Sequence, residues 1–377
     1  MKWKRILFLA FGHMASNFYP GMLSPLLPII TERYGWSIAQ AGVLVMVMQF
    51  FSNAVQPAVG ILNDHRPMRS FLWAGLLISA IPFCFLLSVS HFYLMAIILA
   101  VAGTGVAVYH PVGVVAASHA ADENRRGLSM ALFTSGGSVG VTIAPLAAVL
   151  VIKVLGEQYL PLIALPAVIM AVYFFRDRSI QVSEHTGHTV RELFESLRGS
   201  RRELFILWLI SSFRAVVYTL VGAFLPMLAI ERGASYAVSA YYLSGALFAG
   251  LIGLFIGGHL SDRYGRRKIT AITLFVSTPL LFAFLHTSGF VSTAFLLLGY
   301  LTLSSTIPVN IIMAQQVAPK LAGMASSLVM GVSFMVGAFM APPFGALADR
   351  IGVEAAMNVI FIFPLLGGLT VFFLRRE

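Results

Sequence analysis

The stretch Gly258-His-Leu-Ser-Asp262-Arg263-Tyr-Gly265-Arg266-Arg267-Lys268 separates two long apolar runs. It contains one carboxylate and four cations, whereas the runs on either side carry almost no charge. The earlier stretch Gly60-Ile-Leu-Asn-Asp64 has its glycine, leucine and aspartate at the same spacing, and Arg66 and Arg69 follow it. A short charged segment between apolar runs is typical of a loop that joins two membrane-spanning helices.

The composition extends this interpretation to the whole chain. Of the 377 residues, 58% are hydrophobic and 11% are charged, whereas about a quarter of the residues of a soluble domain are charged. About 20 apolar residues span a bilayer, so the sequence predicts an all-α integral membrane protein with twelve transmembrane helices. The expected spans are residues 6–30, 38–62, 70–90, 92–118, 128–153, 158–175, 204–230, 236–260, 269–288, 290–313, 322–346 and 354–374.

The loop charges predict an orientation in the membrane. Of the 25 Lys and Arg residues, 20 lie on the side of the N-terminus, and four, Arg33, Lys153, Arg232 and Arg350, lie on the other side. The positive-inside rule then places both termini in the cytoplasm. We expect the protein to lie in the inner (plasma) membrane. The longest polar stretch, residues 176–203, is expected to be a cytoplasmic linker between six-helix bundles formed by residues 1–175 and 204–377.

An internal repeat relates the two halves of the sequence at a shift of about 198 residues. At this shift Pro28 falls on Pro226, and Glu32-Arg33 resembles Glu231-Arg232 with a shift one residue longer. With a shift one residue shorter, Gly140-Val-Thr-Ile-Ala-Pro145 falls on Gly337-Ala-Phe-Met-Ala-Pro342. Two homologous six-helix halves imply a substrate cavity between them near the membrane midplane and transport by alternating access.

The charged segment that begins at Gly258 resembles the loop signature between the second and third helices of each half in the major facilitator superfamily. The repeat extends this resemblance over the whole chain, although the first copy lacks the second glycine. The resemblance implies the major facilitator fold and secondary active transport. Four further stretches resemble the fosmidomycin-resistance-like exporter group and imply outward transport: His13-Met-Ala-Ser-Asn17, Gln56-Pro57-Ala-Val-Gly60, Gly103-Thr-Gly-Val-Ala-Val-Tyr109-His110-Pro111 and Gly136-Gly137-Ser-Val-Gly140.

Two positions depart from the pattern of that group. Asn17 stands where the group usually has an aspartate in the first span, and Val112 stands where a glutamate is frequent after the His-Pro pair. All fifteen acids lie in loops or at span ends, so the titratable groups well inside the spans are chiefly His13 and His110. Any proton coupling is therefore expected to depend on these histidines, whose unperturbed pKa is about 6.5. Packing of a neutral histidine in an apolar helix is the alternative role.

Arg214 is a permanent cation about ten residues into the seventh span, which corresponds to a depth of roughly 15 Å. That depth is too great for the side chain to reach the headgroups easily. A cation inside the membrane costs several kcal/mol unless it is paired or hydrated, and no acid lies at midspan to pair with it. A bound anion would provide the missing partner. Hydrogen bonds to backbone carbonyls, or extension along the helix towards water, are the alternatives.

The candidate functional residues form three groups. Polar residues inside spans are substrate-binding candidates, although interhelical hydrogen bonds would also account for them. Charged residues of the loop segments are gating candidates whose alternative role is to set orientation, and glycines and prolines are candidates for close helix packing and bending. The groups are, in this order, His13, Asn17, Tyr109, His110, Arg214, Tyr218 and Asn310; Asp64, Arg66, Asp262, Arg263, Arg266 and Arg267; and Gly136, Gly140, Pro145, Gly337 and Pro342.

The favoured function is export of a small organic anion or amphiphilic drug by a secondary transporter. Uptake of an anionic metabolite by uniport or exchange, a non-transporting membrane sensor and a lipid flippase are the alternatives. The expected partners are the small-molecule substrate, protons and the lipid bilayer, but not nucleic acid, because the cations are scattered among short loops. We expect a monomer without enzymatic activity, cofactor or metal. The chain lacks a Walker-type ATP motif, and Cys84, its single cysteine, can form no intrachain disulfide.

Overall fold

The computed structural model describes residues 2–120, 126–182, 200–319 and 322–375, and within these ranges the chain is helical and contains no strand. The chain divides into two compact units. Unit 1 comprises Met1–Trp36, Val43–Thr186 and Tyr236–Ser244, and unit 2 comprises Ser37–Gly42, Gly187–Ser235 and Gly245–Glu377.

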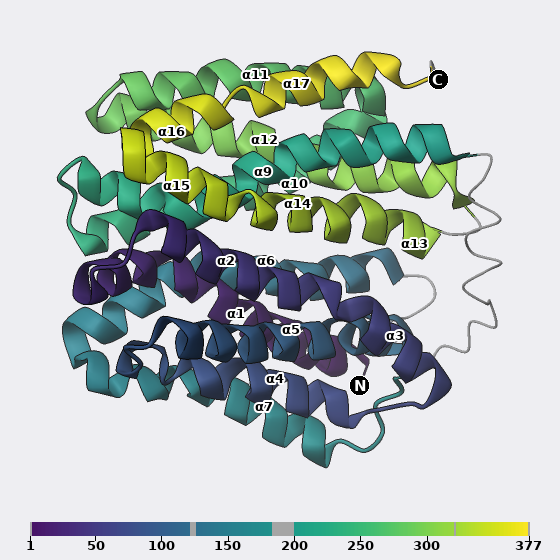
Figure 1. The fold of residues 1–377 in the computed structure, drawn as a ribbon. Helices are drawn as coiled ribbons and strands as arrows, with labels where there is room; N and C mark the ends of the chain where they lie inside the picture. The colour runs from purple at the N-terminus through teal and green to yellow at the C-terminus, as the bar shows by residue number, and fades with distance from the viewer. Residues whose placement is uncertain (1, 121–125, 183–199, 320–321, 376–377) are drawn as a thin grey trace. The chain divides into compact units, whose positions relative to one another are not determined.

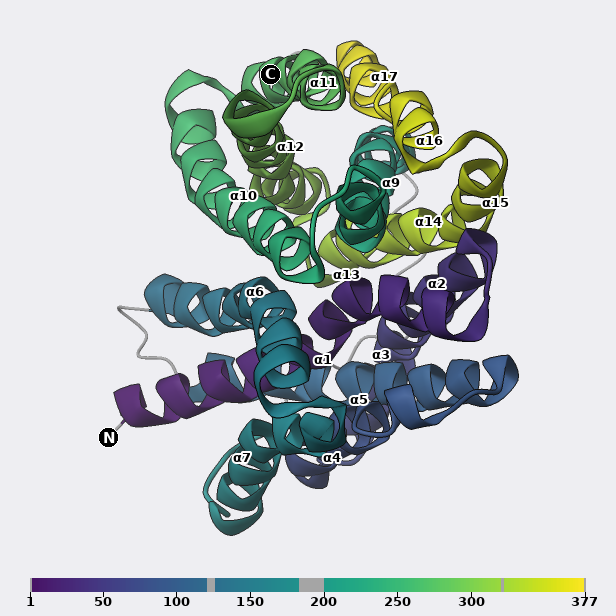
Figure 2. The same cartoon turned by 90° about the vertical axis from the view of Figure 1, so that its left-hand side faces the viewer.

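In unit 1 the first helix packs along the sixth and also against the fifth, while α4 packs against α5 and α7. This arrangement can be followed in Figures 1 and 2. The elements from the first half of the chain are α1 (Lys2–Tyr34), α2 (Ile38–Ala54), α3 (Gln56–His65), α4 (Ser70–Phe83), η1 (Leu86–Ser88), α5 (Phe92–Ala120), α6 (Arg126–Leu150), η3 (Val151–Leu155), η4 (Glu157–Ala164) and α7 (Leu165–Arg176).

In unit 2 the central element is α9, which packs against α12, α14 and α17. In an apolar 18-residue stretch of α9, 72% of the residues are buried, compared with 28–50% in the corresponding stretches of the other candidate spans. A side chain on α9 therefore has little access to lipid. The elements from the second half of the chain are α9 (Arg201–Glu231), α10 (Tyr236–Tyr264), α11 (Arg266–His286), α12 (Gly289–Val317), α13 (Ala322–Ser327), η7 (Leu328–Val332), α14 (Ser333–Phe339), α15 (Ala341–Ile351), α16 (Val353–Ile360), α17 (Phe363–Thr370) and η8 (Val371–Phe373).

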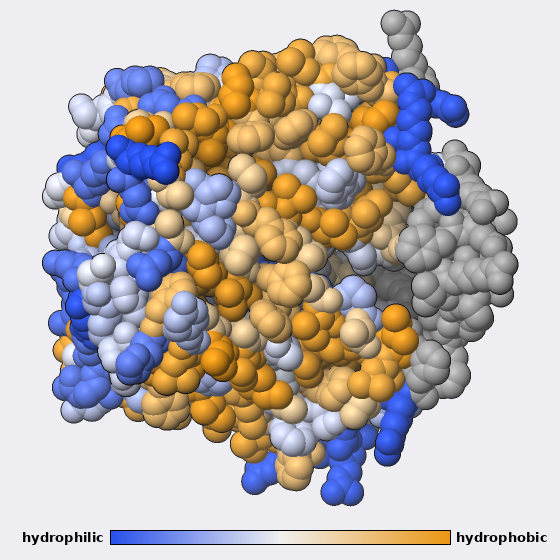
Figure 3. Space-filling view, viewed as in Figure 1, coloured by the Kyte–Doolittle hydropathy of each residue, from blue (hydrophilic) through white to orange (hydrophobic). Residues whose placement is uncertain are grey.

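The structure shows the predicted membrane fold, because eleven stretches of the described helices are long and apolar enough to cross a bilayer. The remaining long helix, α1, contains His13, Asn17 and three prolines, which lower its mean hydropathy. In Figure 3, hydrophobic side chains cover the middles of the helices on the visible face, and hydrophilic side chains gather towards their ends. Large apolar side chains such as Ile169, Phe175 and Phe255 are exposed on the helices, as contact with lipid requires.

Several predicted spans are interrupted. The span expected at 38–62 is divided into α2 and α3 at Val55, two residues before Pro57. The span expected at 322–346 consists of α13, a π-helical turn, α14 and α15, and Pro342 lies in the first turn of α15. Proline lacks the backbone N–H that continues a helix, so it is accommodated best in a first turn.

Two of the predicted packing glycines allow α6 to lie directly against α1. A Cβ atom at Gly136 would collide with the carbonyl oxygen of Ala10, and one at Gly140 would collide with that of Met14. In unit 2, a Cβ atom at Gly337 would lie 2.7 Å from the carbonyl oxygen of Ala215 on α9. These three positions require glycine because the neighbouring helix backbone occupies the space of a side chain.

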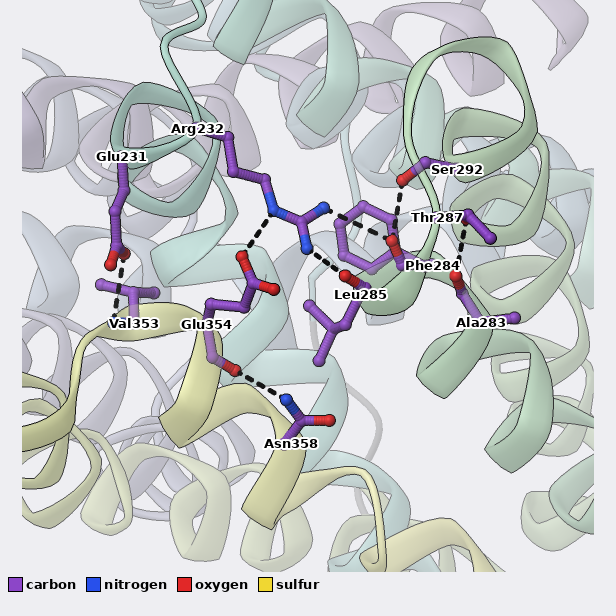
Figure 4. A network of polar contacts seen from close by, with 10 residues as sticks. All are labelled: Glu231, Arg232, Ala283, Phe284, Leu285, Thr287, Ser292, Val353, Glu354 and Asn358. Atoms are coloured by element: carbon purple, nitrogen blue, oxygen red, sulfur yellow. Dashed lines mark hydrogen bonds and ion pairs between the residues drawn. The ribbon is translucent and has the colours of Figure 1, made fainter.

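One end of unit 2 is held together by Arg232, which follows the last residue of α9 (Figure 4). Its guanidinium pairs with the Glu354 carboxylate at 2.9 Å and donates hydrogen bonds to the carbonyl oxygens of Phe284 and Leu285. The neighbouring Glu231 accepts a hydrogen bond from the Val353 N–H at 3.1 Å. Arg232 therefore ties the ends of α9, α11 and α16 together. We call Arg232, Glu354, Phe284 and Leu285 the Arg232 brace.

Unit 1 contains a matching group of contacts. Arg33, in the last turn of α1, pairs with Glu157 at 2.5 Å and donates to the carbonyl oxygen of Leu87 at 3.4 Å. The Tyr34 hydroxyl donates to the same carbonyl oxygen at 3.1 Å. We call Arg33, Glu157 and Leu87 the Arg33 brace.

Candidate functional site

Unit 1 contains a connected polar cluster formed by residues from α1, α5 and α6. The His13 ring bonds to the carbonyl oxygen of Phe133 through Nδ1 at 2.9 Å. Asn17, one turn further along α1, lies 3.4 Å from His13 Nε2 through its Nδ2 atom and 2.8 Å from His110 Nε2 through its Oδ1 atom. The two imidazole rings meet edge to face with centroids 4.6 Å apart. The structure therefore brings together three of the predicted substrate-binding residues.

Two further residues support this cluster. The Phe133 ring stacks on His13 with centroids 4.5 Å apart. A Cβ atom at Gly137 would lie 2.6 Å from both His13 and Asn17, so this position leaves room for their side chains.

Tyr109 is fully buried next to the cluster and donates its hydroxyl hydrogen bond to the Leu9 carbonyl oxygen at 2.9 Å. That bond supports a role for Tyr109 in holding α5 against α1.

The second polar feature lies within unit 2. Arg214 on α9 is 1% exposed, and its Nε and Nη1 atoms are buried without a hydrogen-bond partner. Its Cζ atom lies 5.1 Å from the centre of the Phe334 ring and 6.0 Å from the centre of the Tyr218 ring. Arg214 and Tyr218 were predicted from the sequence, whereas the contribution of Phe334 was not.

Other unpartnered polar atoms occur in the same unit. Asn310 on α12 donates to the Ser211 hydroxyl at 3.0 Å, but its Oδ1 atom is buried without a partner, and so is the indole N–H of Trp208. Ser211 precedes Arg214 by three residues on α9, so the two residues are neighbours on the same face of the helix. Unit 2 therefore holds buried hydrogen-bonding atoms that the described side chains do not satisfy.

The acids of the described part of unit 2 all occur near helix ends. They are Glu203 and Glu231 at the two ends of α9, Asp262 in the last turn of α10, Asp349 in the last turn of α15 and Glu354 in the first turn of α16. None of them is recorded in contact with Arg214. The expectation that no midspan acid neutralises Arg214 agrees with this distribution.

The structure also places the gating candidates. Asp262 pairs with Arg266 at 3.5 Å across the turn at Gly265, whose φ of +90° favours glycine. Arg263 lies over the neighbouring Tyr264 ring. The guanidinium of Arg267 donates to the Val371 and Phe372 carbonyl oxygens at 3.3 and 3.0 Å, so it caps the C-terminal turn of its own unit.

In the first copy of this segment Arg66 is exposed at the end of α3. The side chain of Asp64 lies outside the described part of the chain. A gating role for these six residues remains a prediction.

Three of the supporting residues, Phe133, Gly137 and Phe334, are not on the predicted list of substrate-binding residues. Phe133 and Phe334 belong to a chain with 30 phenylalanines, so no sequence feature distinguishes them. Gly137 lies in the glycine cluster that the sequence associates with helix packing. The signal that could have found it is its place on α6 between the two glycines that approach α1.

Comparison with known proteins agrees with this architecture. The sequence profile of the Major Facilitator Superfamily matches residues 7–331. The chain is 27% identical to the MFS-type transporter YfnC of Bacillus subtilis (strain 168) over 367 residues, which cover 94% of this chain and 89% of that protein. It is 26% identical to the fosmidomycin resistance protein of Escherichia coli (strain K12) over 374 residues, which cover 97% and 91% of the two chains.

Solved structures show the same fold at low sequence identity. A bacterial homologue of the human lysosomal transporter Spinster, in an inward-facing and unoccupied conformation, matches with a TM-score of 0.81, 15% identity and coverage of 98% and 96%. A mutant of the nucleoside transporter NupG matches with a TM-score of 0.82, 11% identity and coverage of 99% and 100%. A D-xylose–proton symporter matches with a TM-score of 0.80, 15% identity and coverage of 99% and 97%. The chain is therefore a multi-pass membrane protein that belongs to the major facilitator superfamily, a family of secondary transporters and not of enzymes.

Proposed function

We propose that this secondary transporter moves a small organic anion or an anionic amphiphilic drug across the inner membrane by alternating access, and that Arg214 carries the positive charge of the substrate site. The observation that supports this proposal most directly is the burial of Arg214 without a partner for its Nε and Nη1 atoms. A guanidinium keeps its proton in proteins, so the charge is permanent.

The energetic argument rests on the cost of an uncompensated charge. An arginine at the centre of a membrane costs at least about 2.5–3.5 kcal/mol, and each buried N–H without an acceptor adds about 1–3 kcal/mol. The faces of Phe334 and Tyr218 attract the cation by about 0.5–2 kcal/mol. Ring faces cannot accept all the hydrogen bonds that lie in the guanidinium plane. A carboxylate or phosphonate ligand offers two oxygen atoms to neighbouring N–H groups and supplies the missing charge.

The side chains around Arg214 favour an anion that also has an apolar part. Phe334 and Tyr218 stand at a steep angle to each other with ring centroids 5.6 Å apart, and the Tyr300 ring lies 5.1 Å from Tyr218. Aromatic surfaces of this kind pack against apolar ligand groups, while a few polar atoms set the orientation of the ligand. Asn310 Oδ1 and the Trp208 indole N–H are the candidate polar atoms.

The proposed direction is outward. It rests on the similarity to the fosmidomycin resistance protein, whose name links it to resistance against a drug. Uptake of an anionic metabolite by uniport or exchange uses the same anion site and is the second candidate. Proteoliposomes with an imposed pH gradient distinguish the two, because a proton-driven exporter accumulates labelled anion against its gradient only when the pH gradient is present, whereas a uniporter or anion exchanger needs no pH gradient.

Binding to purified full-length protein tests the anion site. The probes are fosmidomycin, benzoate and inorganic phosphate, with tetraphenylphosphonium as a cation of comparable apolar character. We expect Arg214→Gln to weaken binding of the organic anions at least 100-fold and Arg214→Lys to retain part of it at lower specificity, because lysine keeps the charge but loses the planar donor geometry. Arg350→Gln, which removes an exposed cation at the end of α15, is the matched control.

Unchanged organic-anion affinity in Arg214→Gln would contradict the anion site. Equal losses in Arg214→Gln and Arg350→Gln would also contradict it, because total charge would then explain the effect. Preferential binding of tetraphenylphosphonium to the wild-type protein would assign the opposite charge to the substrate. Thermal stability without ligand is measured on each variant, so that loss of folding is separated from loss of binding.

The proposed orientation, with both termini and the 176–203 linker in the cytoplasm, has its own test. Cys84 is buried, so single cysteines introduced at Ser196 in the linker and at Ser90 between α4 and α5 provide the labels. We expect an impermeant thiol reagent added outside intact cells to label Ser90→Cys and not Ser196→Cys. The reverse labelling pattern would overturn the proposed topology.

A further inference from the structure

The hydrogen bonds of the unit 1 cluster determine which nitrogen of each histidine carries a hydrogen. A backbone carbonyl oxygen only accepts hydrogen bonds, so His13 Nδ1, at 2.9 Å from the Phe133 carbonyl oxygen, must carry one. The neutral His13 ring then has its free electron pair at Nε2. The Asn17 atom facing His13 Nε2 must therefore be the Nδ2 donor, as the 3.4 Å contact has it.

The orientation of Asn17 determines the state of the second histidine. With Nδ2 directed at His13, the Asn17 Oδ1 atom faces His110 Nε2 at 2.8 Å, so His110 Nε2 carries the hydrogen. The free electron pair of His110 is consequently at Nδ1. No hydrogen bond from a described residue to His110 Nδ1 is recorded. When both rings are neutral, the cluster therefore has one defined arrangement of hydrogens, and His110 Nδ1 accepts no hydrogen bond from a described residue.

The two histidines differ in what protonation would cost. A proton on His13 Nε2 would face the Asn17 Nδ2 donor, so the amide would have to rotate and would then face the N–H of His110 with another N–H. A proton on His110 Nδ1 leaves all three hydrogen bonds intact. His13 is 7% exposed, whereas His110 is partly exposed. The hydrogen bonds favour His110, and its side chain is the less buried of the two.

We propose that His110 Nδ1 is the proton-binding atom of this transporter, and that His13 and Asn17 are positioning residues that keep it free to accept the proton. The proposal rests on the proposed transport function and names the coupling ion for it. The imidazole of His110 would then bind and release the proton. The acidic residues that the exporter group has at the positions of Asn17 and Val112 would not be needed for this.

The surroundings limit the site to one proton. The titratable side chain that faces His110 from α1 is His13, and the centres of the two rings are 4.6 Å apart. Once one ring is protonated, charge repulsion opposes protonation of the other. Tyr109 is adjacent on α5, but its hydroxyl is engaged with the Leu9 carbonyl oxygen. From α6 the described contacts on the cluster come from Phe133 and Gly137, which do not titrate. Among the described residues no carboxylate contacts the cluster.

Asn17→Asp provides a diagnostic variant. A carboxylate accepts hydrogen bonds at both oxygens and has no donor for His13 Nε2. His13 must then carry a second hydrogen to remain hydrogen-bonded, and its Nδ1 hydrogen is still held by the Phe133 carbonyl oxygen. In this variant we expect the first proton to bind to His13 instead of His110. The cluster should also titrate at higher pH than in the wild-type protein, because a nearby negative charge stabilises imidazolium.

Nitrogen-15 NMR of histidine-labelled full-length protein in lipid nanodiscs tests the proposal directly, because the ring nitrogen shifts distinguish the two neutral tautomers from imidazolium. The chain has nine histidines, so His13→Gln and His110→Gln assign the two signals. At high pH we expect His13 with hydrogen on Nδ1 and His110 with hydrogen on Nε2. On acidification His110 should become imidazolium while His13 stays neutral.

Either of two NMR results would overturn the proposal: a His110 hydrogen on Nδ1 at high pH, or a first protonation of His13 in the wild-type protein. Proton counting by calorimetry in buffers of different ionisation enthalpy gives an independent measurement. We expect His110→Gln to lose the exchange of a single proton with solvent that accompanies anion binding in the wild-type protein, and His91→Gln, at an exposed position before α5, to keep it.

The Arg214 variants separate this proposal from the anion site. Arg214→Gln should abolish anion binding while the NMR titration of His110 stays as in the wild type. If anion binding survives Arg214→Gln and His110 still titrates first, the anion site is wrong and the proton site stands. If anion binding depends on Arg214 but no proton is taken up or released on binding between pH 5 and 8, the anion site stands and the proton site is wrong.

Discussion

The two units hold their ends together with equivalent contacts. In unit 1 Arg33 pairs with Glu157 and bonds to the carbonyl oxygen of Leu87, and in unit 2 Arg232 pairs with Glu354 and bonds to the carbonyl oxygen of Leu285. Each of these residues is related to its counterpart by a shift of 197–199 residues in the sequence. The internal repeat is therefore a repeat of specific side-chain contacts as well as of apolar runs.

At another position the pair is kept but its charges are exchanged. Arg5 lies 3.9 Å from Asp177 in unit 1, and Glu203 lies 3.5 Å from Arg375 in unit 2. A shift of 198 residues converts 5 to 203 and 177 to 375. The geometry thus selects opposite charges at these two positions without selecting which position is positive.

The middles of the first helix of each half differ at the polar positions of the candidate sites. At the same shift His13 corresponds to Ser211, and Arg214 corresponds to the buried Ser16. Unit 1 carries neutral groups that can take up a proton, whereas unit 2 carries a permanent charge. The comparison teaches that contacts at helix ends maintain the fold in both halves, whereas the buried middles are free to acquire separate chemistry.

The largest effect is expected at the glycines where helix backbones touch. Gly140→Ala and Gly337→Ala should each destabilise the protein by about 1–3 kcal/mol, because the added methyl group must displace the neighbouring backbone. Gly331→Ala is the matched control, since a Cβ atom there meets nothing within 4 Å. Thermal unfolding in detergent measures the three variants. Equal stability of Gly140→Ala and Gly331→Ala would show that the close approach to α1 is not required.

An intermediate effect is expected at the two braces. Arg232→Met should destabilise the protein by about 1–2 kcal/mol and Arg33→Met by less, because Arg232 bonds to two carbonyl oxygens and lies over the Phe284 ring, whereas Arg33 bonds to one. The difference in unfolding temperature between the two variants tests this order. A larger loss in Arg33→Met would show that the number of carbonyl and ring contacts does not set how much each brace stabilises the protein.

The smallest effect is expected at the exchanged pair. Arg5→Glu should cost about 0.2–1 kcal/mol, as is usual for an exposed ion pair, and Arg5→Glu/Asp177→Arg should recover it by adopting the polarity of Glu203 and Arg375. Failure of the double variant to recover stability would mean that the neighbourhood of each pair selects its polarity. The same measurements at several pH values test the contribution of Asp177.

Asp177 follows α7 and lies outside the spans. Burial acts to raise the pKa of its carboxyl group, but hydrogen bonds from Ser179 and Tyr173 and the charge of Arg5 outweigh burial, so the pKa is lowered. A lowered pKa in the folded state means that the carboxylate stabilises the protein above its unfolded-state pKa of about 3.9, and that this contribution disappears as the pH falls through the folded-state value. Asp177→Asn should therefore lower stability at neutral pH and have less effect in strong acid.

The fold was predictable because lipid leaves few alternatives. Every backbone group in a membrane must be hydrogen-bonded within the protein, so a long apolar run has a helix as its simplest solution. The breaks inside spans were not predictable to the same degree. Pro57 and Pro342 mark two of them, but Pro20, Pro25 and Pro28 lie inside the unbroken α1. Whether a proline bends or divides a helix depends on the neighbours that satisfy the freed carbonyl groups.

The candidate site was predictable in part. His13, Asn17, His110 and Arg214 stand out in the sequence because each is polar within an apolar run, and such residues are rarely placed in a membrane without a function. The sequence expected Tyr109 among the substrate-binding residues, and the structure shows its hydroxyl bonded to a carbonyl oxygen of α1. Tyr109 therefore holds two helices together, and a substrate contact by Tyr109 remains a prediction.

The sequence by itself determined the helical membrane fold, the internal repeat and the identity of the unusual polar residues, because hydropathy and charge are properties of single positions. Only the tertiary structure decided which atoms meet. One residue of rotation turns a helix by about 100°, which would carry His13 away from the Phe133 carbonyl oxygen and Arg214 away from the Phe334 ring. That rotation is set by backbone contacts such as those of Gly136 and Gly140 with α1, and the assignment of a proton to one nitrogen of His110 depends on it.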